Sequence, residues 1–189
     1  MKSNKNITLK LIFLIVLVVS NLFFAGCQRK TVTFEPIRIK SKSTKSDKFR
    51  NLKFYSDINW ISLVANTPLI DLENDGIADG VSIRLYFFRK GNPKPVAAKG
   101  TVILHLFQRF KRADGKINDK ELHTWTLSRE QLARSVAIER FGLLCHYVEL
   151  YWSDVKIKAP DVYLRAEFIR DDKRRIFSRP VYLAITLYH

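Results

Sequence analysis

The stretch Val81–Arg89, VSIRLYFFR, decides the fold class of this chain. Every second residue from Val81 to Phe87 is a large apolar one, and the residues between them are Ser82, Arg84 and Tyr86. A period of two residues is typical of a strand with one face on a core. Val181–Leu187 repeats the period near the end of the chain. Both stretches therefore predict strands of sheets with one buried face.

Further strands are predicted on either side of this stretch, at Trp60–Val64, Thr101–Phe107, Leu122–Leu127, Leu143–Trp152, Asp161–Arg170 and Ile176–Tyr188. Polar turns separate several of them, for example at Asp114-Gly115. No crossover helices lie between the strands, which disfavours a parallel sheet. The pattern predicts an all-β fold, a two-sheet antiparallel β-sandwich of about seven strands with one short helix. It is similar to immunoglobulin-like sandwiches in architecture only, because the Cys…Trp…Cys spacing of that group is absent.

The one helix signal follows the predicted strand at 122–127. Ser128 is followed three residues later by Gln131, which is a capping box. Leu132 and Val136 continue an apolar stripe, and Gly142 ends it. We therefore expect a helix over Ser128–Glu139 that bridges the two sheets at one end.

The N-terminal segment has the features of an export signal. It contains three lysines, then the apolar run from Leu11, and it ends in Phe24-Ala25-Gly26-Cys27. The run is shorter than the roughly 20 residues of a bilayer span and suits a signal peptide. The segment resembles the lipobox of bacterial lipoproteins, with Phe24 where Leu is usual. The resemblance implies cleavage before Cys27 and acylation of its thiol, with palmitate-type chains; the alternative is an uncleaved anchor helix.

Three parts of the chain are therefore expected. They are a signal peptide at 1–26, a lipidated cysteine with a basic flexible tether at 27–52, and a β-sandwich domain at 53–189. The formal charge of +15 falls to +12 without the leader, and the tether carries half of that. Its cations are attracted to anionic lipid head groups, or they keep a solvated spacer extended. An edge strand within Thr31–Ile39 is also consistent with the sequence, although Pro36 disfavours a central strand.

An acidic loop is the sharpest local motif. Its carboxylates alternate before a glycine, as hard cations such as calcium require. It is similar to the calcium loops of thrombospondin type 3 and dockerin repeats, but it has no acidic residue at the twelfth place, which is Ser82. The predicted calcium ligands are the side chains of Asp71, Glu73, Asp75 and Asp79 and the carbonyl of Ile77. The alternative is a strand connection in which carboxylates cap backbone N–H groups.

Catalytic motifs are not evident. The four histidines have no metal-ligand spacing, and no serine lies in a G-x-S-x-G context. Cys145 lies in an apolar run and is interpreted as a small buried hydrophobe. Aromatic residues either form a sugar-stacking platform or fill the core; they are Trp60, Trp125, Trp152, Tyr86, Tyr151 and Tyr163.

The expected function is that of a lipid-anchored, exported lipoprotein with a non-enzymatic binding or envelope-structural module. Gln28 after the cysteine favours the outer membrane in an organism with two membranes. Its expected partners are the bilayer, through Cys27, and an unknown envelope protein or glycan; nucleic acid is disfavoured by export. One alternative is a carbohydrate-binding module. The other is an envelope hydrolase, which would need a cleft holding His146 beside a carboxylate.

Overall fold

The computed structural model describes residues 37–39, 52–139, 141–152, 157 and 161–185. The signal peptide, Cys27 and most of the tether lie outside the described residues, so the lipidation and the flexible tether stay predictions. Within the part of the chain that is described, no helix is both long enough and apolar enough to cross a bilayer.

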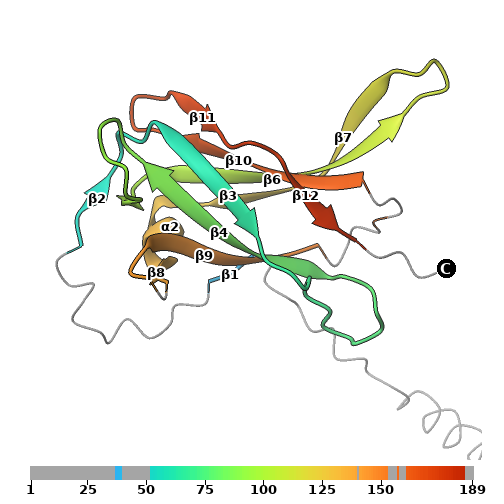
Figure 1. Ribbon diagram of the computed structural model, residues 1–189, viewed down its shortest axis with the longest axis horizontal. Coiled ribbons are helices and arrows are strands. Elements are labelled where there is room, and N and C mark those ends of the chain that lie inside the picture. The colour runs from blue at the N-terminus through green and yellow to red at the C-terminus, as the bar shows by residue number, and fades with distance from the viewer. Residues whose placement is uncertain (1–36, 40–51, 140, 153–156, 158–160, 186–189) are drawn as a thin grey trace, which may run out of the picture. The chain divides into compact units, whose positions relative to one another are not determined.

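Two five-stranded sheets make up the domain (Figure 1). The β4 sheet contains β1 (Ile37–Arg38), β9 (Leu144–Tyr151), β4 (Gly80–Phe88) and β3 (Trp60–Ala65) in that order, with β8 (Val136–Ile138) also paired to β9. The β6 sheet contains β11 (Arg175–Phe177), β10 (Asp161–Ile169), β6 (Thr101–Lys111) and β7 (Ile117–Leu127) in that order, with β12 (Val181–Ala184) also paired to β10. A short parallel pair joins β2 (Phe54–Tyr55) to β5 (Ala97–Ala98).

The core lies between the two sheets, as the two-residue period predicts. Every second residue of β4 from Val81 to Phe87 is fully buried. The facing residues of the β6 sheet are buried as well; they include Leu104, Leu106, Leu164 and Phe168. The rings of Phe87 and Phe168 meet across the sandwich with centroids 5.2 Å apart. The all-β, antiparallel two-sheet sandwich is confirmed.

The structure divides this fold more finely than the sequence predicts, into twelve strands within the described residues. The predicted last strand, Ile176–Tyr188, is in fact β11 and β12, with a break at Ser178–Pro180. Pro180 has no N–H to donate to a ladder. Ser178 binds β10 across the break, because its Oγ accepts a hydrogen bond from the N–H of Ala166 at 2.9 Å.

The helix α2 (Arg129–Arg134) begins where the capping box places it. The Ser128 Oγ accepts from the N–H of Gln131 at 3.2 Å, and the Gln131 side chain accepts from the N–H of Ser128 at 2.8 Å. The predicted extension to Glu139 is wrong, since Val136–Ile138 forms β8 against β9. Pairing with a neighbouring strand outweighs the weak helical preference of these residues.

The β4 sheet also includes residues upstream of the expected domain start at 53. Ile37 lies opposite Leu150, and Arg38 lies opposite Glu149. The edge strand expected within Thr31–Ile39 is therefore present at Ile37–Arg38. Only nine residues separate Cys27 from this strand in the sequence.

Candidate functional site

The outer face of the β6 sheet carries a group of interacting polar and aromatic side chains. Register brings them together from strands far apart in the sequence: Tyr163 lies between Phe107 and Tyr182, and Arg165 lies beside His105. Glu167 lies between Ile103 of β6 and Phe177 of β11. These residues alternate with core residues on the same strands, so the sandwich fixes their positions.

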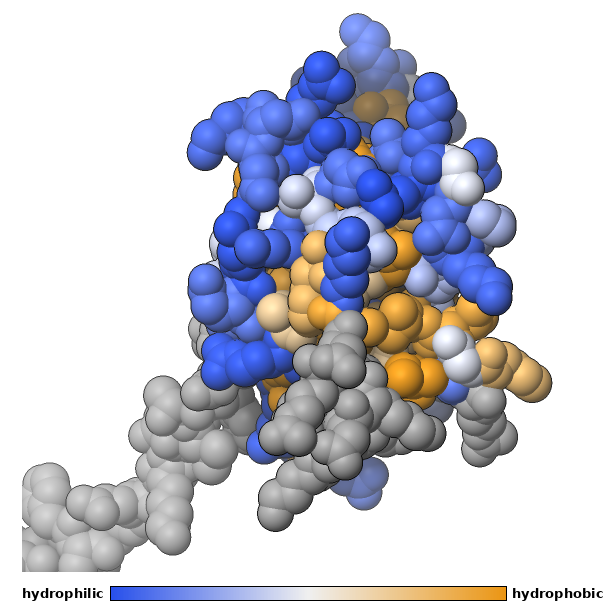
Figure 2. All heavy atoms as spheres, turned by 90° about the vertical axis from the view of Figure 1, so that its left-hand side faces the viewer, coloured by the Kyte–Doolittle hydropathy of each residue, from blue (hydrophilic) through white to orange (hydrophobic). Residues whose placement is uncertain are grey.

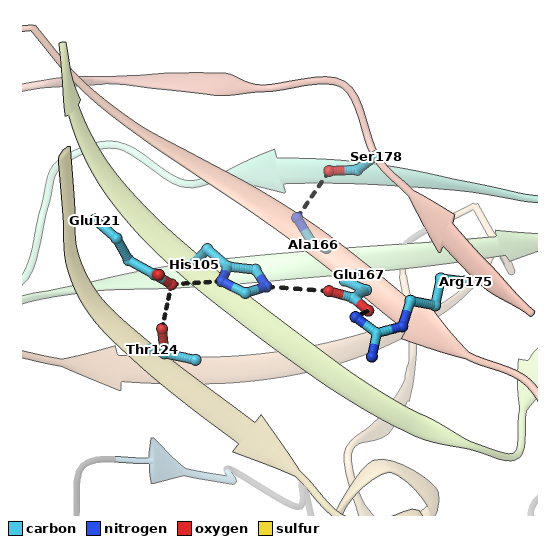
Figure 3. A network of polar contacts seen from close by, with 7 residues as sticks. All are labelled: His105, Glu121, Thr124, Ala166, Glu167, Arg175 and Ser178. Atoms are coloured by element: carbon cyan, nitrogen blue, oxygen red, sulfur yellow. Dashed lines mark hydrogen bonds and ion pairs between the residues drawn. The ribbon is translucent and has the colours of Figure 1, made fainter. Parts of the chain in front are cut away.

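A polar network joins four strands on this face (Figure 3). The His105 ring lies between two carboxylates, with Nδ1 2.6 Å from Glu121 Oε1 and Nε2 3.4 Å from Glu167 Oε2. The Thr124 hydroxyl donates to Glu121. Arg175 Nη1 lies 3.0 Å from Glu167 Oε1, and the Glu167 side chain is only 5% exposed. The ion pair offsets the cost of burying that carboxylate.

An aromatic row continues from this network along the same face. The rings of Phe107 and Tyr163 stack with centroids 5.2 Å apart, and Tyr163 meets Tyr182 at 5.5 Å. The Arg109 guanidinium lies over both tyrosine rings, 5.3 Å and 5.6 Å from their centroids. Asp119 accepts a hydrogen bond from Arg109 Nε at 2.9 Å. Tyr182 remains 52% exposed at the end of the row.

The charges of this face are set by its hydrogen bonds. The Thr124 hydroxyl, and then His105, lower the pKa of Glu121. Arg109 lowers the pKa of Asp119. Burial raises the pKa of Tyr163, which therefore keeps its proton at neutral pH. The face thus presents ionised groups that are already paired, beside aromatic rings held in fixed positions.

The polar side chains of this network are partnered with one another. The Thr124 hydroxyl donates to the carboxylate of Glu121. Both nitrogens of His105 face carboxylate oxygens. The residues of the network position one another across strands, and the exposed rings beside them offer contact surface.

His146 does not form the cleft that the hydrolase alternative requires. It is 1% exposed, on the core side of β9. Its Nδ1–H donates to the carbonyl of Leu132 at 2.8 Å, and its Nε2 accepts from the N–H of Ala98 at 3.1 Å. Burial lowers the pKa of His146 to about 4, so the ring is neutral at pH 7. Its partners are backbone groups and Ser135, and its role is to join α2, β5 and β9.

The acidic loop connects β3 to β4, and its carboxylates cap backbone groups. Asp71 Oδ2 accepts from the N–H of Gly76 at 2.9 Å, and Asp75 Oδ1 accepts from that of Ile77 at 2.8 Å. Asp79 Oδ2 accepts from the N–H of Leu72 at 2.7 Å. Over the residues that the structure describes, no group of three or more His, Cys, Asp or Glu side chains is placed to hold a metal ion. These bonds are those of the strand-connection alternative, and the calcium site stays a prediction.

The six aromatic residues do not form one platform. Trp125 and Trp152 are each 2% exposed in the core. Their indole N–H groups donate to the carbonyls of Tyr151 and Ala78 at 3.0 Å and 2.9 Å. Tyr151 and Tyr163 are also buried. Trp60 is 45% exposed, on the outer face of the β4 sheet, and stacks on Phe88 with centroids 5.0 Å apart.

Cys145 is buried on β9, as interpreted from its apolar surroundings. Burial raises the pKa of its thiol to about 11, and the carboxylate of Glu139 acts in the same direction. The thiol is therefore protonated and unreactive at neutral pH.

Sequence reasoning missed the residues of the β6 face. A usable signal was present: charged side chains occupy the solvent-facing positions Arg165 and Glu167 of a predicted strand. What the sequence does not give is the register that places them beside His105, 62 residues from Glu167. No protein-family model matches this chain, and a search of curated proteins finds no match either.

Proposed function

We propose that this chain is an exported lipoprotein, anchored by acylated Cys27, whose sandwich binds an envelope protein through the outer face of the β6 sheet. The anchor is supported by the sequence of residues 1–27. The binding role rests on one observation, the row of tyrosine rings and Arg109 on the β6 face, which ends at the exposed Tyr182.

That row has the composition and the rigidity of a protein-binding surface. Tyrosine and arginine are enriched among residues that dominate binding energy. Tyr182 and Phe177, 52% and 45% exposed, lie on β12 and β11, which both pair with β10 along the edge opposite β6. The Arg165 guanidinium covers the Phe177 ring at 4.4 Å, and Arg109 covers Tyr182. Side chains already held in place lose less entropy when a partner binds.

A photo-crosslinking amino acid at Tyr182 tests this proposal in living cells. We expect a discrete protein adduct after detergent extraction of the envelope, and we expect Arg109→Ala to weaken it. The control is the same amino acid at Ile77, which is 62% exposed in the acidic loop. Adducts of equal pattern and intensity at both positions, or none at Tyr182, would contradict the proposal.

A carbohydrate-binding module is the second candidate, favoured by the exposed Trp60 stacked on Phe88. Sugar rings stack on such surfaces through their apolar faces. A glycan array with wild type and Trp60→Ala distinguishes this candidate: glycan binding that Trp60→Ala abolishes supports it. On the described residues, no observation favours the envelope hydrolase.

A further inference from the structure

The edge of the β6 sheet formed by β11 and β12 carries two exposed aromatic rings with an arginine at the level between them. On β10, Glu167 lies opposite Phe177, and Tyr163 lies opposite Tyr182. Arg165 is therefore at the level between the two rings, and all three side chains are exposed. The two levels are four positions apart on β10, or about 13 Å. This spacing suits one short segment of a partner.

A second arginine, Arg179, lies on the link between β11 and β12. Just before it, the Ser178 N–H donates to the carbonyl of Ala166 at 2.8 Å, and the Ser178 Oγ accepts from the N–H of Ala166 at 2.9 Å. These two bonds hold the link beside Ala166, the residue that follows Arg165 on β10. The exposed Arg179 is therefore presented from a fixed backbone position alongside this part of β10.

These two arginines differ from their neighbours in having no carboxylate partner. The Arg165 guanidinium packs on the Phe177 ring, and over the described residues neither Arg165 nor Arg179 makes an ion pair. The β10–β11 turn lies at the left-hand end of the domain in Figure 1, and Figure 2 shows hydrophilic residues over the upper part of this end. The arginines beside that turn are paired with carboxylates; they are Arg170, Arg174 and Arg175. Arg165 and Arg179 thus remain available for an anion.

The surrounding charges indicate where that anion comes from. Arginine binds both carboxylates and phosphates through paired N–H groups. On the same face, however, the side chains of Glu121 and Asp119 are 46% and 34% exposed, and Asp161 is exposed as well. A layer of anionic lipid head groups would meet these carboxylates, which is unfavourable because like charges repel. A protein segment can place a carboxylate at the arginines and neutral side chains elsewhere.

We propose that the partner docks an acidic segment on this edge, with a carboxylate bound by Arg165 and Arg179 and with neighbouring side chains against the Phe177 and Tyr182 rings. The inference rests on the proposed function, and it adds the chemistry of the partner. Aromatic and arginine side chains are the groups that most often dominate the energy of a protein interface. The complementary charge fixes the register of the segment between the two rings.

Charge reversal at the two arginines tests this inference in living cells. The photo-crosslinker p-benzoylphenylalanine in place of Tyr182 keeps an aromatic ring there and converts the bound partner into a covalent adduct. We expect Arg165→Glu and Arg179→Glu each to lower the yield of the protein adduct about tenfold. The control is Lys94→Glu, which makes the same change of net charge on the exposed loop between β4 and β5 and should leave the yield unchanged.

Two further measurements exclude indirect effects. Among the described residues Arg179 makes no ion pair or ring contact, so Arg179→Glu should leave the melting temperature unchanged. The crosslinked peptide of the partner, identified by mass spectrometry, should contain an aspartate or glutamate close to the attachment point. Changing that residue to lysine in the partner should restore the adduct with Arg179→Glu, because the charges are then exchanged.

The outcomes separate this inference from the proposed function. A protein adduct that both Arg165→Glu and Arg179→Glu leave at full yield overturns the inference, while the proposed function stands. An equal loss with Lys94→Glu also overturns it, because net charge and not this edge would then govern binding. An adduct to a phospholipid in place of a protein, or no adduct when both arginines are intact, overturns the inference and the proposed function together.

Discussion

The burial of His146 predicts a specific loss of stability below neutral pH. The folded protein holds this ring neutral because burial lowers its pKa from 6.5 to about 4. The unfolded chain binds a proton near pH 6.5, so it gains protons first as the pH falls. The stability that His146 contributes is therefore fully present above pH 6.5 and is lost between pH 6.5 and about 4.

The expected size follows from these two values. Each unit of difference between the folded and unfolded pKa values corresponds to about 1.4 kcal/mol in the free energy of unfolding. Between pH 7 and pH 4.5, the free energy of unfolding should fall by about 2 kcal/mol from this residue alone. For a domain of this size, the melting temperature should fall by roughly 4–8 °C.

Urea unfolding at a series of pH values measures this loss, with His146→Asn as the control. An amide can donate to the carbonyl of Leu132 but does not titrate. The variant is expected to be less stable at pH 7, because part of the core contact is lost, and to lose less stability between pH 7 and 4.5. Carboxylates whose pKa values are lowered, such as Glu121, respond mostly below this window. Parallel pH profiles of wild type and variant would refute the reasoning.

Other perturbations give further expected outcomes. Gly80→Ala places a Cβ 2.4 Å from the carbonyl oxygen of Leu150, so it should destabilise the protein by about 1–3 kcal/mol in urea unfolding. If the acidic loop binds calcium, millimolar calcium should stabilise wild type by roughly 0.4–1.4 kcal/mol, and the double variant Asp71→Ala with Asp75→Ala should not respond. If wild type and the double variant melt at the same temperature both with calcium and with chelator, the loop is a strand connection and not a metal site.

The strands were predictable where one face is buried and the other is not. Val81 to Phe87 alternate because each apolar side chain enters the same core. The capping box at Ser128 was predictable because it is a local arrangement of side chain and backbone. Periods of two residues and caps are properties of short segments, so a single sequence carries them.

The remaining features depend on contacts between distant segments. Val136–Ile138 became a strand because β9 lies beside it, which local preference does not contain. The two-residue pairing of Phe54 with Ala97 has no periodicity to recognise. A tryptophan has the same side chain in a core as on a sugar-binding surface, so the sequence cannot distinguish these two roles for Trp125 and Trp152. Their burial assigns both to the core. The His105 network likewise exists only through register.

The proposed function depends on the lipid anchor. The mass of the N-terminal peptide from membrane-extracted protein tests this anchor most directly. We expect a peptide that begins at Cys27 and carries a thioether-linked diacylglycerol. Cys27→Ser should accumulate as a full-length, unmodified chain and serves as the control. A wild-type protein that retains residues 1–26 with a free Cys27 thiol would contradict the lipoprotein assignment.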